Sequence, residues 1–407
     1  MRLTSKLYAQ HLGWMFKKHW QVQGKKVVHD TGAQAELEKL GIAVVDPNDI
    51  VNPKHPFEKV EIVGYKEKEI LNDETHPNWH EKRCHVYGDG NVLLEGVPQA
   101  ELLTKTIEII GFPKNITEAI QRMQIPNTVE RSVQHSILSS HVYDAEQVKL
   151  PKARTYYVLP NTYGISYPRR NRLLINKLIF ECEKMSGRSI SARRRIIDNV
   201  DFRVTLPRNI DILQFNVSAE KMITSSRPIE PVKSEHDVDL PILFPIKCTI
   251  TIPKTNIYDS STFYPFNEKL NCSHPHTIFS HFDKKIVGNL HGSSVTPSQF
   301  QSRTMLKAFS VAAARAKQIY GEKALGKLPK PIVIQSIQTD GRSFHFGVFQ
   351  LNTLAIGDDV DDGLKNYWFH EPQLDLFTDC SYKLGKPYLE GYNKDVIRCI
   401  NAFYNNS

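Results

Sequence analysis

Residues 332 to 353 form two apolar runs joined by Asp340 and Gly341, and this pattern strongly restricts the local fold. An Asp-Gly pair between apolar runs favours a tight hairpin turn, because such a turn needs positive φ at its central residues. With these two residues as the loop, the expected facing pairs on one side are Ile337 with Phe344, Gln335 with Phe346 and Val333 with Val348. The pairs on the other side are Ser336 with His345, Ile334 with Gly347 and Ile332 with Phe349. Both sides are mainly apolar, which predicts a hairpin inside a sheet covered on both faces.

His345 lies within this hairpin and allows two interpretations. A buried histidine is usually held by hydrogen bonds, and Ser336 or a backbone carbonyl is the expected partner. A catalytic role would need a carboxylate, but the expected register separates His345 from Asp340 by about four strand steps of 3.3 Å, too far for a hydrogen bond. A carboxylate elsewhere in the sequence could still serve as the catalytic partner of His345. We predict a structural histidine and no catalytic residue.

The composition is that of a globular protein. The chain has 407 residues, of which 40% are hydrophobic and 24% charged, enough for one large core or two to three ordinary domains. No apolar run reaches the length of a membrane-spanning helix. The six cysteines are scattered singly, which favours reduced thiols over a disulfide framework. We expect neither a membrane nor a small-molecule substrate as partner.

The net charge of +8 is concentrated in two segments. Residues 1 to 29 hold six lysines and arginines and no acid, and residues 168 to 195 hold nine basic residues against two glutamates. Such local concentration favours a polyanion as partner, although a solvated basic face is the alternative. Arginine forks suit phosphate groups, so we predict RNA binding. The candidate contacts are Arg169, Arg170, Arg172, Lys177, Arg188, Arg193, Arg194, Arg195, Lys17, Lys18, Lys25 and Lys26.

The first 90 residues divide into two expected parts. Residues 1 to 29 are similar in composition to a mitochondrial targeting segment, and if the mature protein retains them the same charges could contact RNA. Residues 30 to 90 contain several prolines and one expected helix at Ala33 to Leu40, which predicts an extended arm. Residues 91 to 407 are expected to form a mixed α/β core.

Periodicity within the core predicts helices and strands in mixed order. The expected helices cover residues 98–110, 114–124, 129–141, 171–186, 302–320, 362–368 and 393–404, with a further basic helix carrying Arg193 to Arg195. In the 171–186 helix the expected buried residues are Leu174, Leu178, Ile179 and Cys182. The expected strands cover 201–206 and 210–217, with short strands near 242–252. The predicted fold class is α+β, with helices packed on a largely antiparallel sheet that contains the 332–352 hairpin.

Three short motifs could carry chemistry, and each has a simpler explanation. GEKALGKL at 321–328 resembles a phosphate-binding loop, but it lacks the Ser or Thr for magnesium and runs from helix to strand, the wrong direction. Cys272, His274, His276 and His281 could bind zinc, yet no second ligand pair accompanies them. The acidic run 358–362 is expected to be a solvated loop. We therefore predict no metal and no cofactor.

Three segments carry a resemblance to a known family. VLLEGVPQAELLTKT at 92–106, SVAAARAKQIYG at 310–321 and IVIQSIQTDGRSFHFGVFQLNT at 332–353 resemble mitochondrial large-subunit ribosomal protein number thirty-seven of animals, over most of residues 90 to 355. The resemblance implies a non-enzymatic constituent of the large subunit in the mitochondrial matrix. It also implies contacts with ribosomal RNA and with neighbouring ribosomal proteins, including a related protein formerly named after programmed cell death.

Two further functional hypotheses stay open on sequence grounds. One is a mitochondrial nucleic-acid enzyme that uses His345 with a carboxylate. The other is a matrix adaptor that binds only proteins. Charge reversal of Arg193, Arg194 and Arg195 separates the adaptor from an RNA-binding scaffold, because only the scaffold should lose its RNA association.

Overall fold

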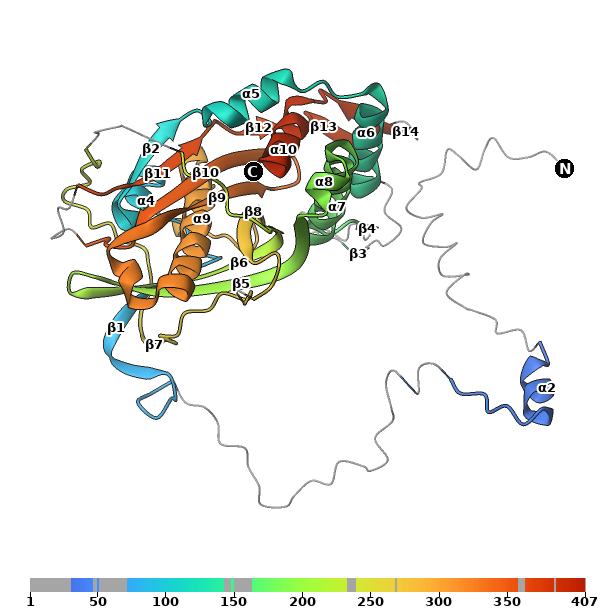
Figure 1. Ribbon diagram of the computed structural model, residues 1–407, viewed down its shortest axis with the longest axis horizontal. Coiled ribbons are helices and arrows are strands. Elements are labelled where there is room, and N and C mark those ends of the chain that lie inside the picture. Colours follow the sequence, from blue (N-terminus) through green and yellow to red (C-terminus); the bar gives the residue numbers. More distant parts are fainter. Residues whose placement is uncertain are drawn as a thin grey trace, which may run out of the picture. The chain divides into compact units, whose positions relative to one another are not determined.

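A ten-stranded mixed sheet organises the larger part of the molecule (Figure 1). The strand order is β2-β11-β10-β9-β8-β6-β1-β7, with β5 paired to β6 and β12 paired to β10. The pairs β1–β6, β2–β11 and β8–β9 are parallel, and the other pairs are antiparallel. The strands are β1 (Trp79–Gly88), β2 (Thr106–Ile110), β5 (Arg194–Arg208), β6 (Asp211–Ser225), β7 (Lys254–Ile257), β8 (His274–His281), β9 (Lys327–Thr339), β10 (Ser343–Thr353), β11 (Asn366–His370) and β12 (Leu374–Asp375).

The computed structural model describes residues 31–46, 50, 72–142, 148–149, 163–232, 239–267, 269–357, 363–383 and 386–406. The chain forms two units, Met1–His76 and Pro77–Ser407. In the first unit, α2 (Ala33–Lys39) confirms the expected helix, and none of its residues is buried. In the second unit, β1 pairs with β6 and β7, so this strand is part of the large sheet.

Helices cover both faces of the sheet. One face packs against α4 (Val97–Thr104) and α9 (Pro297–Tyr320), and the other packs against α5 (Lys114–Arg122), α6 (Asn127–His141), α7 (Tyr167–Ser186) and α10 (Asp395–Asn405). Each interface is a separate apolar cluster. The shorter elements are α8 (Arg188–Ser191), the 3-10 helices Leu290–Gly292 and Gly321–Leu325, and the two-stranded sheets β3 (Val148–Lys149) with β4 (Tyr163–Gly164) and β13 (Asp379–Lys383) with β14 (Lys386–Glu390). This arrangement confirms the predicted α+β class and its largely antiparallel sheet.

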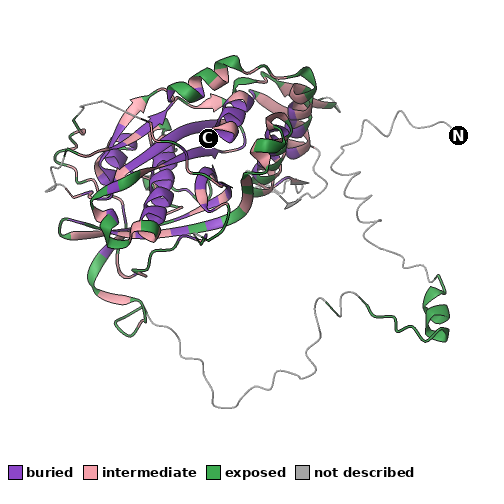
Figure 2. Cartoon of the chain, viewed as in Figure 1, coloured by how far each residue is buried: buried purple, intermediate pink, exposed green. Residues whose placement is uncertain are grey.

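The helix α9 is buried along most of its length, as Figure 2 shows in purple. Thr296 caps its first turn together with Gln299 in a reciprocal capping box, and Gly321 follows its last residue. Small residues such as Ala312 and Ala313 let the helix approach the sheet closely. A helix buried on nearly all sides belongs inside a core, and α9 fills that position between the sheet and α4.

The central hairpin of β9 and β10 corrects the predicted register. Ile337 pairs with Phe346 and Gln335 with Val348, so the predicted partners are wrong by two residues on one strand. The turn explains this, because the Asp340 carboxylate accepts hydrogen bonds from the backbone N–H groups of Arg342 (2.9 Å) and Ser343 (2.8 Å). Gly341 and Arg342 are therefore the central turn residues. A shift of two keeps every side chain on its predicted face, and both faces are buried as expected.

Three local predictions are wrong for identifiable reasons. The helix expected over 98–110 ends at Thr104, because Lys105 has φ 51° and the β-branched residues that follow form β2. The helix expected near 362–368 is replaced at 366–370 by β11, whose aromatic run favours a strand. Turns occupy 242–252 in place of strands, because neighbouring prolines remove ladder donors. The strands of this region are β7 and β8.

The helices predicted at 114–124, 129–141, 171–186, 302–320 and 393–404 are confirmed by α5, α6, α7, α9 and α10. The predicted inward residues of α7 are all buried, namely Leu174, Leu178, Ile179 and Cys182. In the described part of the chain, no helix combines the length and the apolar character that crossing a membrane requires.

Candidate nucleic-acid interface

The basic stretch from Arg169 to Arg195 is distributed over α7, α8 and the start of β5. The predicted helix over Arg193 to Arg195 is wrong: Arg193 lies in a turn, and Arg194 and Arg195 begin a strand. Ile196 and Ile197 decide this, because their β-branched side chains pair with β6 opposite Ile223 and Met222. The arginines therefore alternate in direction as they do along a strand.

Arg194 is engaged inside the fold. Its guanidinium donates to the backbone carbonyls of Tyr404 (3.3 Å) and Asn406 and to the hydroxyl of Ser225. Burial lowers the pKa of this guanidinium, which still remains a cation. Arg194 therefore holds the end of α10 against the β5–β6 ribbon, at the edge where β5 begins and β6 ends. By contrast, the side chains of Arg188, Arg193 and Arg195 are exposed.

Two other candidates also make internal contacts. The Arg170 guanidinium lies 5.2 Å from the ring centre of Tyr167, and Lys177 donates to the hydroxyl of Ser139 on α6. Burial, together with the smaller effect of the Arg170 charge, lowers the pKa of the neighbouring His141 to about 4. Lys17, Lys18, Lys25 and Lys26 lie outside the described residues.

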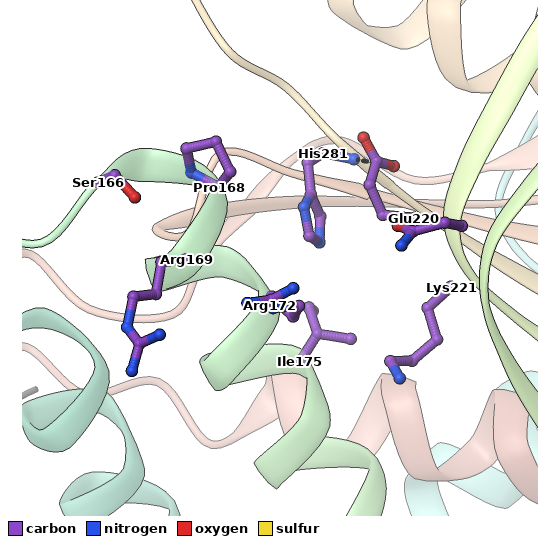
Figure 3. A pocket seen from close by; sticks show the side chains of 9 residues that line it. Ser166, Pro168, Arg169, Arg172, Ile175, Glu220, Lys221 and His281 are labelled. Carbon is purple, nitrogen blue, oxygen red and sulfur yellow. Dashed lines mark hydrogen bonds between the residues drawn. The ribbon is translucent and has the colours of Figure 1, made fainter. Parts of the chain in front are cut away.

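Arg169 and Arg172 border a cavity of about 300 Å³ beside the first turn of α7, drawn in Figure 3. We call it the α7 pocket; its polar lining residues used below are Arg169, Arg172, Asn199, Glu220, Lys221 and His281. β5 supplies Asn199, β6 supplies Glu220 and Lys221, and the last residue of β8 supplies His281. The sequence prediction missed Asn199, Glu220 and Lys221, because only the pairing of distant strands brings them to α7.

His281 forms one wall of the pocket. Its backbone N–H donates to Glu220 Oε2 at 2.9 Å, and its ring Nε2 is buried without a hydrogen-bond partner in the described structure. Burial lowers the pKa of His281, the Glu220 carboxylate raises it, and the cations Lys307, Lys221 and Arg172 lower it. Lys221 is itself paired with Asp198. The pocket therefore combines a neutral imidazole, three cations and one carboxylate.

His345 does not border this pocket and is fully buried. Its Nδ1 lies 2.8 Å from the Thr304 hydroxyl and its Nε2 lies 3.0 Å from Nδ1 of His370. The predicted partners were therefore wrong, because the two-residue register shift places Ser336 opposite Gly347. His370 in turn contacts Glu108 Oε1 at 2.7 Å. These contacts hold the His345 ring inside the core, and its structural role stays a prediction.

The remaining candidate motifs were the possible zinc ligands, the loop at 321–328 and the acidic run at 358–362. His276 lies 2.7 Å from the carbonyl of Asn406, and Cys272 lies 3.7 Å from the carbonyl of Arg193. Among the residues placed in the structure, no three His, Cys, Asp or Glu side chains gather as a metal site would require. Residues 321–328 run from α9 into β9, the direction expected from the sequence. Residues 358–362 lie outside the described structure.

Comparison with known proteins shows similarity to ribosomal proteins. "Large ribosomal subunit protein mL37" of Rattus norvegicus is 30% identical over 311 residues, which cover 73% of this chain and 67% of that protein. The protein of the same name from Gallus gallus is 30% identical over 319 residues, covering 75% and 68%. The Bos taurus protein is 29% identical over 311 residues, covering 74% and 68%.

A family model also matches residues 291–407, and its description is "Mitochondrial 28S ribosomal protein S30 (PDCD9)". This description names a 28S protein, whereas the relatives are named for the large subunit. The relatives carry more weight for this chain, because their similarity extends over about three times as many residues. The residues matched by the family include α9, the central hairpin and α10.

Proposed function

This chain belongs to the mL37 family of large ribosomal subunit proteins, and we propose on this premise that it is a structural, non-enzymatic constituent of the mitochondrial large ribosomal subunit. The observation that carries the proposal is the 30% identity to mL37 proteins over about three quarters of the chain. The word "mitochondrial" in the family-model description and the acid-free basic segment 1–29 support the matrix as its location.

Ribosomal RNA is the proposed polyanion partner. Five arginines are the proposed phosphate contacts, and we call them the arginine set: Arg169, Arg172, Arg188, Arg193 and Arg195. Arg172 lies about 21 Å along the helix axis from Ser186, the last residue of α7, at 1.5 Å per residue, and Arg188 begins α8 after Gly187. That distance allows one RNA segment to meet several members of the set. Arg170, Lys177 and Arg194 contribute chiefly to the packing that holds this surface.

The N-terminal segments are proposed to extend the interface. Lys17, Lys18, Lys25 and Lys26 would add RNA contacts if residues 1–29 remain in the mature protein. Residues 30–90 would serve largely as an arm that reaches neighbouring proteins, with β1 joining it to the sheet of the 91–407 core. The related protein once named after programmed cell death is a proposed neighbour, as the family resemblance implies.

Sedimentation of gently lysed mitochondria tests the proposed function. The lysate is run through sucrose gradients with magnesium and after chelation, and each fraction is probed for this protein. We expect stoichiometric co-migration with the large subunit under both conditions. A slowly sedimenting pool with little protein in the subunit fractions would contradict the ribosomal proposal and favour an adaptor or an enzyme.

RNA contact has a separate test in the salt dependence of binding to large-subunit ribosomal RNA fragments. If the five arginines neutralise about five phosphates, log affinity should fall against log salt with a slope of roughly −3.5 to −4.5. Charge reversal of Arg193 and Arg195 should weaken binding and reduce the slope. Unchanged binding would favour the adaptor hypothesis.

A further inference from the structure

Cationic side chains line the α7 pocket, and two of them, Arg172 and Lys221, present their charge to the cavity. Arg172 has no acidic partner among the described residues, and Figure 3 shows it on α7 with Lys221 on the other side of the pocket. The Lys221 ammonium binds Asp198, whose side chain is 55% exposed, so solvent weakens that pair. The Nε2 atom of His281 lacks a partner in the described structure. A buried polar atom without a partner calls for an explanation, and a bound ligand is one.

The first turn of α7 faces the same cavity. Ser166 is the N-cap residue, but its side chain makes no capping hydrogen bond, and Ser166 and Pro168 both line the pocket. α7 has 20 residues, and the N-terminus of such a helix carries partial positive charge and unpaired amides. Helix and side chains therefore favour an anion at one position.

Glu220 is the acidic residue of the pocket wall, and its charge is partly compensated. Its Oε2 accepts the hydrogen bond from the His281 backbone N–H. The buried Lys307 lies near enough for the Glu220 carboxylate to raise the pKa of that ammonium, although burial lowers this pKa more strongly. The carboxylate is thus occupied at the wall, while Arg172 and Lys221 place positive charge in the cavity.

We propose that the α7 pocket binds a phosphate group through Arg172, Lys221 and the Nε2 atom of His281, with Arg169 at its rim. The cavity of about 300 Å³ has room for a phosphate with bound water or for a phosphate with part of its nucleotide. The phosphate can belong to an RNA backbone or to a free phosphorylated compound. The proposal rests on the proposed function for the RNA source and assigns this pocket as a defined contact within the arginine set.

The first experiment uses the full chain and inorganic phosphate. Binding is measured by isothermal titration and by ³¹P NMR for the wild type, Arg172→Gln and Glu220→Gln. Loss of a charged hydrogen-bond donor predicts at least roughly tenfold weaker binding for R172Q. E220Q should bind phosphate more tightly, because it removes a negative charge while keeping an acceptor for the His281 N–H.

The matched control is Arg122→Gln, which removes an exposed arginine outside both the pocket and the arginine set. It should leave phosphate binding unchanged, and thermal unfolding of each variant establishes that it is folded. Phosphate should also raise the pKa of His281 in the wild type, measured by NMR against the influence of Glu220, Lys307, Lys221 and Arg172. No phosphate binding, or equal losses in R172Q and R122Q, would overturn the pocket proposal.

A competition experiment separates the two sources of phosphate. If the ligand is an RNA phosphate, a ribosomal RNA fragment should displace inorganic phosphate, and R172Q should lower the salt slope by about 0.7 to 0.9. If RNA binds without displacing phosphate, the source is a free phosphorylated compound. RNA binding that depends on Arg188, Arg193 and Arg195 but not on the pocket would overturn this inference and leave the proposed RNA contact intact.

Discussion

Gly347 on β10 lies directly beneath the indole of Trp368 on β11, and a β-carbon at Gly347 would stand 2.1 Å from Cη2 of that ring. The two residues belong to adjacent antiparallel strands, and Trp368 is fully buried in the α9 face of the sheet. No side chain larger than hydrogen fits at this position without moving the indole. The close approach therefore requires glycine at position 347.

Gly347→Ala should destabilise the fold. Overpacking a well-filled core typically costs about 1 to 3 kcal/mol, and this site has no flexible side-chain end that can yield. The measurement is the free energy of unfolding in urea. The same substitution in a Trp368→Leu background should cost clearly less, because the clashing ring is absent. Equal costs in both backgrounds would show that the indole does not set the constraint.

Glu101 should make stability depend on pH. Its Oε1 accepts the backbone N–H of Glu108 at 2.8 Å, yet burial raises its pKa to about 7, helped by the Glu108 charge. A raised pKa means that the folded state favours the protonated carboxyl. Its contribution is therefore fully present below the ordinary value of about 4.5 and is lost as pH rises through about 7.

Glu101→Gln tests this directly, because the amide resembles the protonated acid. Relative to the wild type, it should gain about 1 to 2 kcal/mol between pH 4.5 and pH 8, after allowance for solvent screening. Urea unfolding at both values provides the measurement. A difference between the two proteins that does not change with pH would contradict the assignment.

The three consecutive arginines should respond differently to substitution. Arg194→Gln removes donors to Tyr404, Asn406 and Ser225, and we expect a loss of about 1 to 3 kcal/mol of stability. Arg193→Gln and Arg195→Gln serve as matched controls, because their side chains are exposed. These two should unfold like the wild type but bind RNA more weakly. Equal stability of all three variants would exclude the anchoring role of Arg194.

His345→Gln should reduce stability without removing a reaction. Burial lowers the pKa of His345 well below its ordinary value, so the neutral ring contributes stability above pH 6.5 that is lost as pH falls. Loss of the Thr304 contact should cost about 1 to 3 kcal/mol at pH 7.5 and less at pH 5.5. Unfolding at both pH values and sedimentation with ribosomes supply the test. An unfolding cost that grows toward acid pH would contradict the neutral ring.

Local periodicity was sufficient to predict α7 and its buried face. Leu174, Leu178 and Cys182 recur at helical spacing, and Gly187 ends the pattern, so no distant residue was needed. The same holds for the two faces of the central hairpin. Its partners were shifted because the Asp340 side chain closes the turn, a contact that an Asp-Gly pattern does not specify.

The pocket was beyond local prediction. Lys221 and His281 reach α7 only because β6 pairs with β5 and β8, and the pairing of distant strands leaves no periodic trace in the sequence. The basic helix over Arg193 to Arg195 failed for a related reason. A run of arginines is compatible with either a helix or a strand. Pairing of β5 with β6 makes Arg194 and Arg195 part of a strand.

The parallel pairing of β2 with β11 determines when the sheet can finish folding. Residues 106–110 are synthesised early, but their strand partner at 366–370 emerges after most of the chain has been made. The hairpin, β11 and α10 must therefore be present before the sheet can close, so folding has a high contact order and finishes late. Until then the apolar face that receives α10 stays uncovered and open to aggregation.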